Sequence, residues 1–222
     1  MEPIRILYEN QAFAVCLKPR NVLSQAGGPG ETSMIDLLSA QLGGEIYPVH
    51  RLDRQVGGVM VYAKTQKSAA WFSREIQQGN LKKEYLAVVH GCPEADSGEL
   101  NDLLLHDARK NKSYVVNRMR GGVKKARLSY AVLEKQPDRT LVQVRLFTGR
   151  THQIRVQFAS RRHPLWGDGK YGSRIKGDIA LQSARLRFIH PDTGKVMDFR
   201  LPVPGTWPAW GIRQENDNGT TV

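Results

Sequence analysis

The sequence has few cysteines and lacks the motifs that mark several enzyme classes. Cys16 and Cys92 are the only cysteines in 222 residues, and two thiols without CxxC spacing support neither a disulfide framework nor a zinc site. No GxGxxG opens a helix after a strand, and GxxxxGKS/T, HExxH and GxSxG are absent. These absences argue against nucleotide-cradling loops, zinc proteases and serine hydrolases. Because the six histidines are also dispersed, we expect neither a metal site nor a cofactor.

Long apolar segments are missing as well. The N-terminal residues, MEPIRILYEN, contain no apolar signal core, and no uninterrupted apolar stretch approaches membrane-spanning length. Cys16 lies in the apolar run FAVCL at 13–17 and is expected to be a small core residue. We therefore predict a reducing, cytoplasmic location and no membrane partner.

Acidic residues are outnumbered by basic ones. Lys and Arg total 33 against 21 Asp and Glu, which gives a formal net charge of +12 and a pI near 9.9. Such an excess opposes compaction by self-repulsion, so a polyanionic partner such as nucleic acid is a natural explanation. The bias is strongest at 109–127, where eight Lys or Arg occur without an acid. A solvated charged face is the simpler alternative for that segment.

The remaining pattern predicts short strands, several helices and many turns. Residues 4–18 are expected to form a β-hairpin. Apolar periodicity and cap residues predict helices at 33–42, from Thr65 to a stop at Gly79, from near Thr151, and at 178–184; strands are predicted at 59–63, 81–90, 126–133, 140–147, 185–190 and 195–201. Gly121-Gly122 predicts a hairpin turn inside 109–127.

The order of these elements indicates a fold class. Strands that follow one another directly outnumber helices, and few connections are long enough for parallel crossovers. We therefore predict an α+β fold with a mixed, mostly antiparallel central sheet flanked by helices and loops. The length and the absence of an internal linker are compatible with a single domain over 1–213. Residues 214–222 are nearly free of apolar side chains and are predicted to be a disordered tail.

One carboxylate stands among cations. Asp53 lies between Arg51 and Arg54, beside His50, and is followed by two glycines and an apolar run. A surface ion pair is the common explanation for such a cluster. A nucleophilic carboxylate instead needs an ionised oxygen, and a nearby guanidinium favours the ionised form. From these residues alone, Asp53 can be a nucleophile, a general base or an ion-pair partner.

Several short motifs, in order, resemble those of the RluA-type RNA pseudouridine synthases. The HRLD motif at 50–53, with Gly58 and VMVYAK at 59–64, resembles the segment around that family's catalytic aspartate. Further matches are LYEN at 7–10, KP at 18–19, SQ at 24–25, LKKEYLAVVHG at 81–91, TGRTHQIRV at 148–156, GDGKYG at 167–172 and IALQSARL at 179–186. The likeness extends from about residue 6 to residue 204, nearly the whole chain.

This resemblance implies the pseudouridine synthase fold, with an active-site cleft across the sheet, and an isomerisation that needs no cofactor. In that reaction the N1–C1′ bond of uridine breaks, the uracil turns, and C5 joins C1′. Asp53 would be the essential carboxylate. Tyr85 would stack on the uracil and help to remove the C5 proton, and Ile154 would line the pocket. Arg155 would keep Asp53 charged, with Arg150 as the alternative.

The resemblance also implies base flipping and an RNA partner. A stacked uridine cannot reach a carboxylate, so it must leave the helix, and Arg51 would enter the space that it vacates. Phosphate contacts are expected from the basic segment at 109–127 and from the cations Arg150, Lys82, Lys83, Lys124 and Lys125. Ribosomal RNA and transfer RNA are both plausible substrates, and we expect a monomer.

The chain departs from the family pattern in places. Val56-Gly57 stands where Thr-Ser is frequent, Arg20-Asn21 where Ala-Gly is frequent, and Gln157 where histidine is usual. These differences bear on substrate choice more than on chemistry. We expect no upstream S4-like RNA-binding domain, which many relatives carry.

Two other functions are compatible with the basic composition. A catalytically inactive RNA-binding protein on the same fold would keep the cations without needing Asp53, Tyr85 or Arg155. A hydrolase could pair Asp53 with His50 or His152, but it would require a second carboxylate or a metal site.

Overall fold

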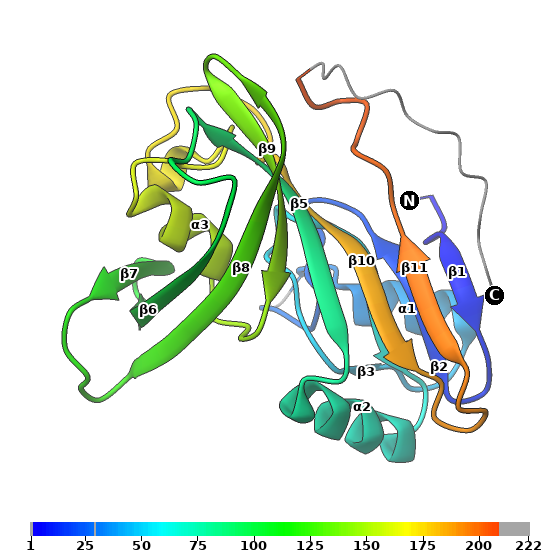
Figure 1. Ribbon diagram of the computed structural model, residues 1–222. Coiled ribbons are helices and arrows are strands. Elements are labelled where there is room, and N and C mark those ends of the chain that lie inside the picture. Colours follow the sequence, from blue (N-terminus) through cyan, green and yellow to red (C-terminus); the bar gives the residue numbers. More distant parts are fainter. Residues whose placement is uncertain (1, 29, 209–222) are drawn as a thin grey trace. The chain divides into compact units, whose positions relative to one another are not determined.

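The computed structural model describes residues 2–28 and 30–208, which fall into two compact units. Unit 1 comprises the described residues up to Lys83 together with Gln182–Pro202, and unit 2 comprises Glu84–Leu181 with the described residues that follow Pro202. Figure 1 shows the helices and strands of both. The tail predicted at 214–222 lies outside the described residues, and the single domain over 1–213 stays a prediction.

Unit 1 contains a mixed, mostly antiparallel group of strands. These are β1 (Ile6–Glu9), β2 (Phe13–Lys18), β3 (Tyr47–Pro48), β4 (Gly57–Ala63), β10 (Leu181–Ile189) and β11 (Val196–Arg200). Only the pairing of β4 with β10 is parallel among those described for this unit. All seven residues of β4 are buried, which makes β4 the centre of the core. The hairpin predicted at 4–18 and the strand predicted at 59–63 are confirmed.

Local hydrogen bonds fix both helices of unit 1. In α1 (Met34–Leu42), Ser33 and Asp36 form a capping box, and in α2 (Gln66–Gln78), Thr65 and Ser68 do the same. Such caps satisfy backbone N–H groups that have no partner inside the helix. Gly79 ends α2 in the left-handed conformation. The predicted helix at 33–42 and the predicted caps of α2 are confirmed.

The helix predicted at 178–184 is wrong. Most of this segment belongs to β10, whose Gln182 and Ser183 pair in parallel with Gly57 and Gly58 of β4. The Ser183 hydroxyl also donates to the Val59 carbonyl at 2.9 Å. The strand therefore depends on partners more than 120 residues away, a nonlocal interaction that overrides local helix propensity.

Unit 2 contains five strands that pair only in antiparallel fashion among those described for it. Their spatial order is β5-β9-β8-β6-β7, with bounds β5 (Lys82–His90), β6 (Ser97–Asp107), β7 (Lys112–Val116), β8 (Val123–Gln136) and β9 (Arg139–Leu146). Gly121-Gly122 does form a turn, closed by the Val123 N–H to the Arg120 carbonyl at 3.0 Å. The predicted hairpin is wrong, however, because β7 and β8 do not pair with each other. Both pair with β6, a strand that the sequence pattern did not reveal.

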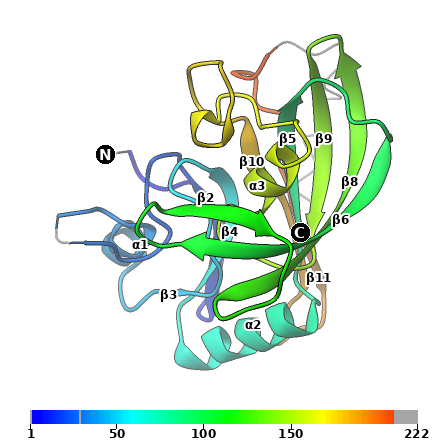
Figure 2. The ribbon, with the colours of Figure 1, turned by 90° about the vertical axis from the view of Figure 1, so that its left-hand side faces the viewer.

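The short helix α3 (Gln153–Ala159) packs in unit 2 against β6 and β7 (Figures 1 and 2). His152 precedes it in a left-handed conformation with φ of 55°, and no side chain caps it. Six of its seven residues are buried, so packing holds it, since seven residues cannot sustain a helix alone. The loop after α3 contains a 3₁₀ turn, η1 (Gly169–Tyr171). None of the described helices is both long and apolar enough to cross a bilayer.

His50 anchors the loop between β3 and β4. Its Nε2 accepts a hydrogen bond from the Val61 N–H at 3.2 Å. Burial of the ring lowers the pKa of His50 from 6.5 to about 3, with a smaller contribution from the charge of Lys83. The imidazole is therefore neutral at physiological pH and serves as an acceptor in the core of the loop.

Gly58→Ala is expected to destabilise unit 1. Gly58 has φ of 122°, and a Cβ there would lie 2.2 Å from the Ser183 carbonyl oxygen, so the backbone of β10 would have to move. We expect a loss of about 2–4 kcal/mol from strain and overpacking, measured by urea unfolding. Gly121→Ala is the control, because nothing lies within 4 Å of its Cβ position. Equal unfolding midpoints for the two variants would contradict the close approach of β4 and β10.

His50 should make stability depend on pH. The folded state binds this proton more weakly than the unfolded chain, so His50 stabilises the fold fully above about pH 6.5, and this stabilisation decreases as the pH falls toward 3. The loss is at most about 1.4 kcal/mol per pH unit. His50→Gln keeps an acceptor for Val61 and should lose less stability between pH 7 and pH 5 in urea unfolding. The exposed His106, changed to Gln, is the control and should retain the full pH dependence of stability. If His50→Gln loses as much stability between pH 7 and pH 5 as the wild-type chain, His50 is not the source of this pH dependence.

Candidate active site

Asp53 opens a tight turn immediately before β4. Its carbonyl accepts the Val56 N–H at 2.9 Å, and the residue is half-buried. Arg51 is exposed, and Arg54 pairs with Glu31 at 2.9 Å. Arg54 therefore has a carboxylate partner other than Asp53, which weakens the interpretation of the cluster as a simple Asp53–Arg54 surface pair.

Ser24 fixes the backbone just before Asp53. Its hydroxyl donates to the Leu52 carbonyl at 2.9 Å and accepts the Leu52 N–H at 3.0 Å. Its own carbonyl accepts the Tyr62 hydroxyl of β4 at 2.8 Å. Ser24 is only 4% exposed. One buried side chain thus fixes the residue before Asp53 to the core.

Lys18 fixes the backbone just after Asp53. Its Nζ, at the end of β2, donates to the carbonyls of Pro19 at 3.0 Å, Arg54 at 3.1 Å and Val56 at 2.8 Å. Burial lowers the pKa of Lys18 to about 8, while the negative charge of Asp53 acts in the opposite direction. A desolvated cation therefore lies close enough to Asp53 to interact with its charge. The KP motif at 18–19 was visible in the sequence, but this function was not.

The backbone accommodates the departures from the family pattern. Asn21 has φ of 65°, and asparagine tolerates this conformation better than most residues other than glycine. The Asn21 N–H donates to the Arg54 carbonyl at 2.8 Å. A Cβ at Gly57 would lie 3.0 Å from the Lys18 carbonyl oxygen, so a larger residue there would press on β2. Asn21 and Gly57 both preserve the turn that carries Asp53.

In unit 2, Tyr85 and Ile154 are buried. Tyr85 lies on β5 opposite Val144 of β9 and is 5% exposed, and Ile154 on α3 is 4% exposed. Strand β5 does not alternate between a buried and a solvated face, because every residue from Tyr85 to Val89 is buried.

Arg155 forms a bidentate ion pair with Asp168. Its Nε donates to Oδ2 at 2.7 Å and its Nη2 to Oδ1 at 2.8 Å, and both residues are almost completely buried. The Tyr171 ring lies over the guanidinium, with its centroid 5.1 Å from Cζ. The GDGKYG segment at 167–172 resembles the family, but nothing in the sequence indicates a function for Asp168. Its partner is 13 residues away, so spacing alone gave no signal.

The predicted RNA-binding cations differ in exposure. Lys124 and Lys125 are exposed on β8, and the Nε of Arg150 donates to the Lys125 carbonyl at 2.9 Å. The Nζ of Lys82 donates to the Gly79 carbonyl. Burial lowers the pKa of Lys83. Lys124 and Lys125 are thus exposed cations of unit 2, whereas Lys83 is largely desolvated.

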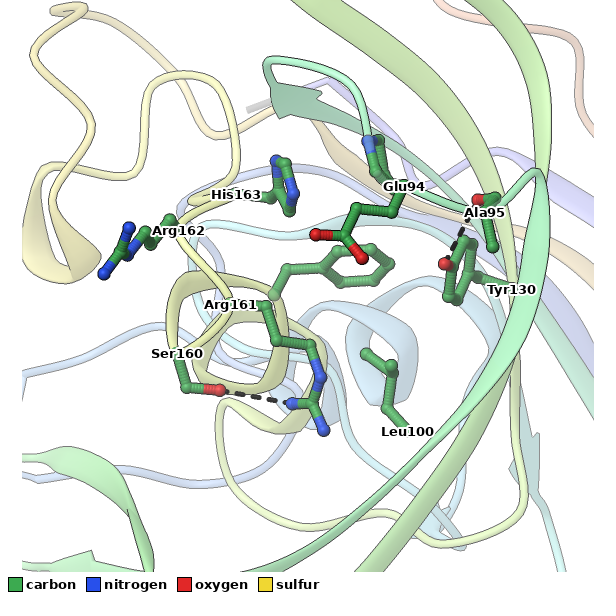
Figure 3. Close-up of a pocket in the computed structure, with 10 residues that line it drawn as sticks. Glu94, Ala95, Leu100, Tyr130, Ser160, Arg161, Arg162 and His163 are labelled. Atoms are coloured by element: carbon green, nitrogen blue, oxygen red, sulfur yellow. Dashed lines mark hydrogen bonds between the residues drawn. The ribbon is translucent and has the colours of Figure 1, made fainter.

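A pocket of about 540 Å³ in unit 2 lies beyond the end of α3 (Figure 3). None of its described lining residues belongs to the predicted site. Arg161 at its rim is paired with Asp102 at 2.9 Å, the Tyr130 hydroxyl donates to the Ala95 carbonyl at 3.2 Å, and His163 Nδ1 contacts the His90 carbonyl at 2.9 Å. Arg161, Tyr130 and His163 thus have protein partners, and we do not assign the pocket a ligand.

The hydrolase hypothesis finds little support in the histidines. The Nε2 of His50 already accepts the Val61 N–H, so it is not available to take a proton from a substrate. His152 Nδ1 contacts the Tyr171 hydroxyl at 3.0 Å. Within residues 2–28 and 30–208, no three His, Cys, Asp or Glu side chains gather in a way that could hold a metal ion.

Comparisons with known proteins agree on one family. A sequence profile described as RNA pseudouridylate synthase matches residues 12–160. Ribosomal large subunit pseudouridine synthase D of Vibrio vulnificus is 35% identical over 224 residues, covering 91% of this chain and 68% of that protein. YlyB of Bacillus subtilis, described as an uncharacterized RNA pseudouridine synthase, is 35% identical over 211 residues, covering 90% and 69%.

Solved structures support the fold. Human RNA pseudouridylate synthase domain containing 4 superposes with a TM-score of 0.75 at 20% identity, covering 90% of this chain and 89% of that chain. The fold class predicted from the sequence is therefore confirmed, and these relatives do not favour an inactive RNA-binding protein. The chain belongs to the RluA-type RNA pseudouridine synthase family and isomerises uridine to pseudouridine in RNA.

Proposed function

We propose that the chain modifies uridines of large-subunit ribosomal RNA with Asp53 as the essential carboxylate. The observation that carries the catalytic part is the turn at Asp53, which Ser24 fixes on one side and Lys18 on the other. A carboxylate on a turn held in this way needs little rearrangement when the substrate binds. The ribosomal part rests on the relative from Vibrio vulnificus, which is named for the large ribosomal subunit.

The reaction is balanced within the nucleoside. The N1–C1′ bond breaks, the uracil turns, C5 bonds to C1′, C5 loses its proton and N1 gains one. An ionised Asp53 suits each of three first steps, namely attack on C1′, proton abstraction at C2′ and addition to C6. The buried Lys18 ammonium interacts electrostatically with the Asp53 carboxylate.

Three residues of unit 2 have proposed roles in the reaction. The Tyr85 ring would stack on the uracil and its hydroxyl would assist loss of the C5 proton, while Ile154 would provide an apolar wall. Arg155 would supply a guanidinium that stabilises negative charge during the reaction. Its nearly complete burial strengthens such an electrostatic effect, because little water screens it.

The RNA would be held by exposed cations. We propose that Arg51, which is exposed beside Asp53, occupies the space left by the flipped uridine, since its planar guanidinium can stack and donate hydrogen bonds. Lys124, Lys125 and Arg150 would contact phosphates. We also propose that the chain acts as a monomer, because every residue invoked here comes from one chain, and that it acts in the cytoplasm.

Asp53→Asn is expected to abolish isomerisation. The substrate is total RNA labelled with 5-³H-uridine and prepared from cells that lack this gene, and tritium release reports loss of the C5 proton. RNA affinity in filter binding should stay within about threefold, because a neutral amide of the same size replaces one carboxylate. The exposed Asp192, changed to Asn, is the control and should retain full turnover.

Turnover by Asp53→Asn would remove this residue from the mechanism. Pseudouridine mapping of the same RNA, before and after treatment with the wild-type chain, identifies the substrate. New pseudouridines in large-subunit ribosomal RNA support the proposal, and new pseudouridines confined to transfer RNA contradict it.

Reversing the charges of Lys124 and Lys125 to Glu should weaken RNA binding and its salt dependence. If each lysine contacts one phosphate, the slope of log affinity against log salt concentration should fall by about 1 per residue. Lys67 and Arg74, both exposed on α2, are changed to Glu as the control with the same change in net charge. An equal effect from both double variants would mean that only overall charge matters.

A further inference from the structure

The ion pair between Arg155 and Asp168 is more deeply buried than the other bidentate pairs described for this chain. The side chains of Arg155 and Asp168 are 3% and 1% exposed. The corresponding values are 37% and 11% for Arg161 and Asp102, 22% and 24% for Arg185 and Asp198, and 51% and 44% for Arg127 and Glu99. Only the first pair joins α3 to the loop that follows it.

The loop holds the Asp168 carboxylate in place. The Asp168 N–H donates to the Leu165 carbonyl at 3.0 Å, and the Asp168 carbonyl accepts the N–H groups of Tyr171 at 3.1 Å and Ser173 at 3.0 Å. Gly167 has φ of 77°, and a Cβ there would lie 2.1 Å from the Asp178 carbonyl oxygen. The tight turn that begins at Gly167 therefore sets the position of Asp168.

Tyr171 connects the same loop to α3 and β7. Its ring lies over the guanidinium of Arg155, its hydroxyl accepts the Ser113 N–H at 2.8 Å, and His152 Nδ1 lies 3.0 Å from that hydroxyl. The Ser113 hydroxyl donates to the Thr151 carbonyl at 2.6 Å. The start of α3, β7 and the loop are thus linked around one guanidinium.

Stability alone explains this arrangement poorly. Two buried charges lose hydration that their attraction recovers only in part, and apolar side chains of similar size often serve a fold equally well. What the pair does achieve is orientation. Two parallel hydrogen bonds from Nε and Nη2 fix the plane of the guanidinium, and the Tyr171 ring limits its rotation.

We propose that Asp168 is a positioning residue that holds the Arg155 guanidinium in the orientation required for uridine isomerisation. The inference rests on the proposed function of Arg155. Asp168 itself does not touch the reacting atoms in this scheme. Its effect passes through Arg155, so it should alter the rate of the chemical step rather than the affinity for RNA.

The test compares Asp168→Asn, Arg155→Lys and the double variant. Each folded variant is used in excess over total RNA labelled with 5-³H-uridine from cells that lack this gene, and the single-turnover rate of tritium release is measured. Half-saturating enzyme concentration and filter binding report RNA affinity. Asp102→Asn is the matched control, because it removes the carboxylate of the bidentate pair with Arg161 in the same unit.

Asp168→Asn should reduce the single-turnover rate by about 10²-fold, as expected for a displaced catalytic group. Affinity should change by less than about threefold, and Asp102→Asn should react at the wild-type rate. Because Asp168 acts through Arg155, adding Asp168→Asn to Arg155→Lys should lower the single-turnover rate by a further factor of less than about three.

Asp168→Glu covers the case in which Asp168→Asn does not fold. It keeps the negative charge beside Arg155 but shifts the carboxylate by one methylene, so it should fold and react about tenfold more slowly with unchanged RNA affinity. A wild-type rate in this variant overturns the inference. The inference is also overturned if Asp168→Asn lowers the single-turnover rate by the same factor in the wild-type chain and in Arg155→Lys.

The inference and the proposed function fail in different ways. If Arg155→Lys reacts at the wild-type rate while Asp53→Asn is inactive, the positioning role is overturned and the catalytic carboxylate stands. If the wild-type chain releases no tritium from any RNA, the proposed function is overturned and the inference with it.

Discussion

The amino group of Lys18 lies inside unit 1 and donates hydrogen bonds to three carbonyl oxygens around the turn that carries Asp53. Lys18 reaches this place because β2 pairs with β4 in a register that puts Lys18 opposite Gly58. Gly58 in turn lacks a Cβ that would collide with Ser183 of β10. The position of the candidate carboxylate therefore depends on the register of three strands. The hydrogen bonds of the buried Lys18 ammonium link the loop to strand β2.

A second buried cation organises unit 2 in a similar way. Arg155 lies on a seven-residue helix without a side-chain cap, and such a helix owes its stability to the surroundings. Asp168 and Tyr171, both from the following loop, surround its guanidinium. In each unit, a hydrogen-bonded cation in the interior thus determines where backbone and side chains lie, because an unpaired buried charge would be far too costly.

The basic composition combines two populations of cations. The exposed residues Lys124 and Lys125 can meet phosphates, whereas Lys18 and Arg155 are almost fully buried and satisfy internal acceptors. The net charge of +12 counts both populations equally. Composition therefore indicated an anionic partner correctly, but it could not separate the cations that bind RNA from those that shape the molecule.

The sequence alone was sufficient to predict features that depend on interactions between nearby residues. The capping residue Thr65, the stop at Gly79 and the hairpin at 4–18 depend on neighbours a few residues away, and the ordered motifs identified the family. Tertiary structure decided the rest. Residues 181–184 of the predicted helix belong to a strand because β4 offers a partner. The contacts of Ser24, Lys18 and Asp168 join residues 28, 38 and 13 positions apart. Sequence spacing does not encode such pairs, because they form only when separate elements pack and bury their polar groups together.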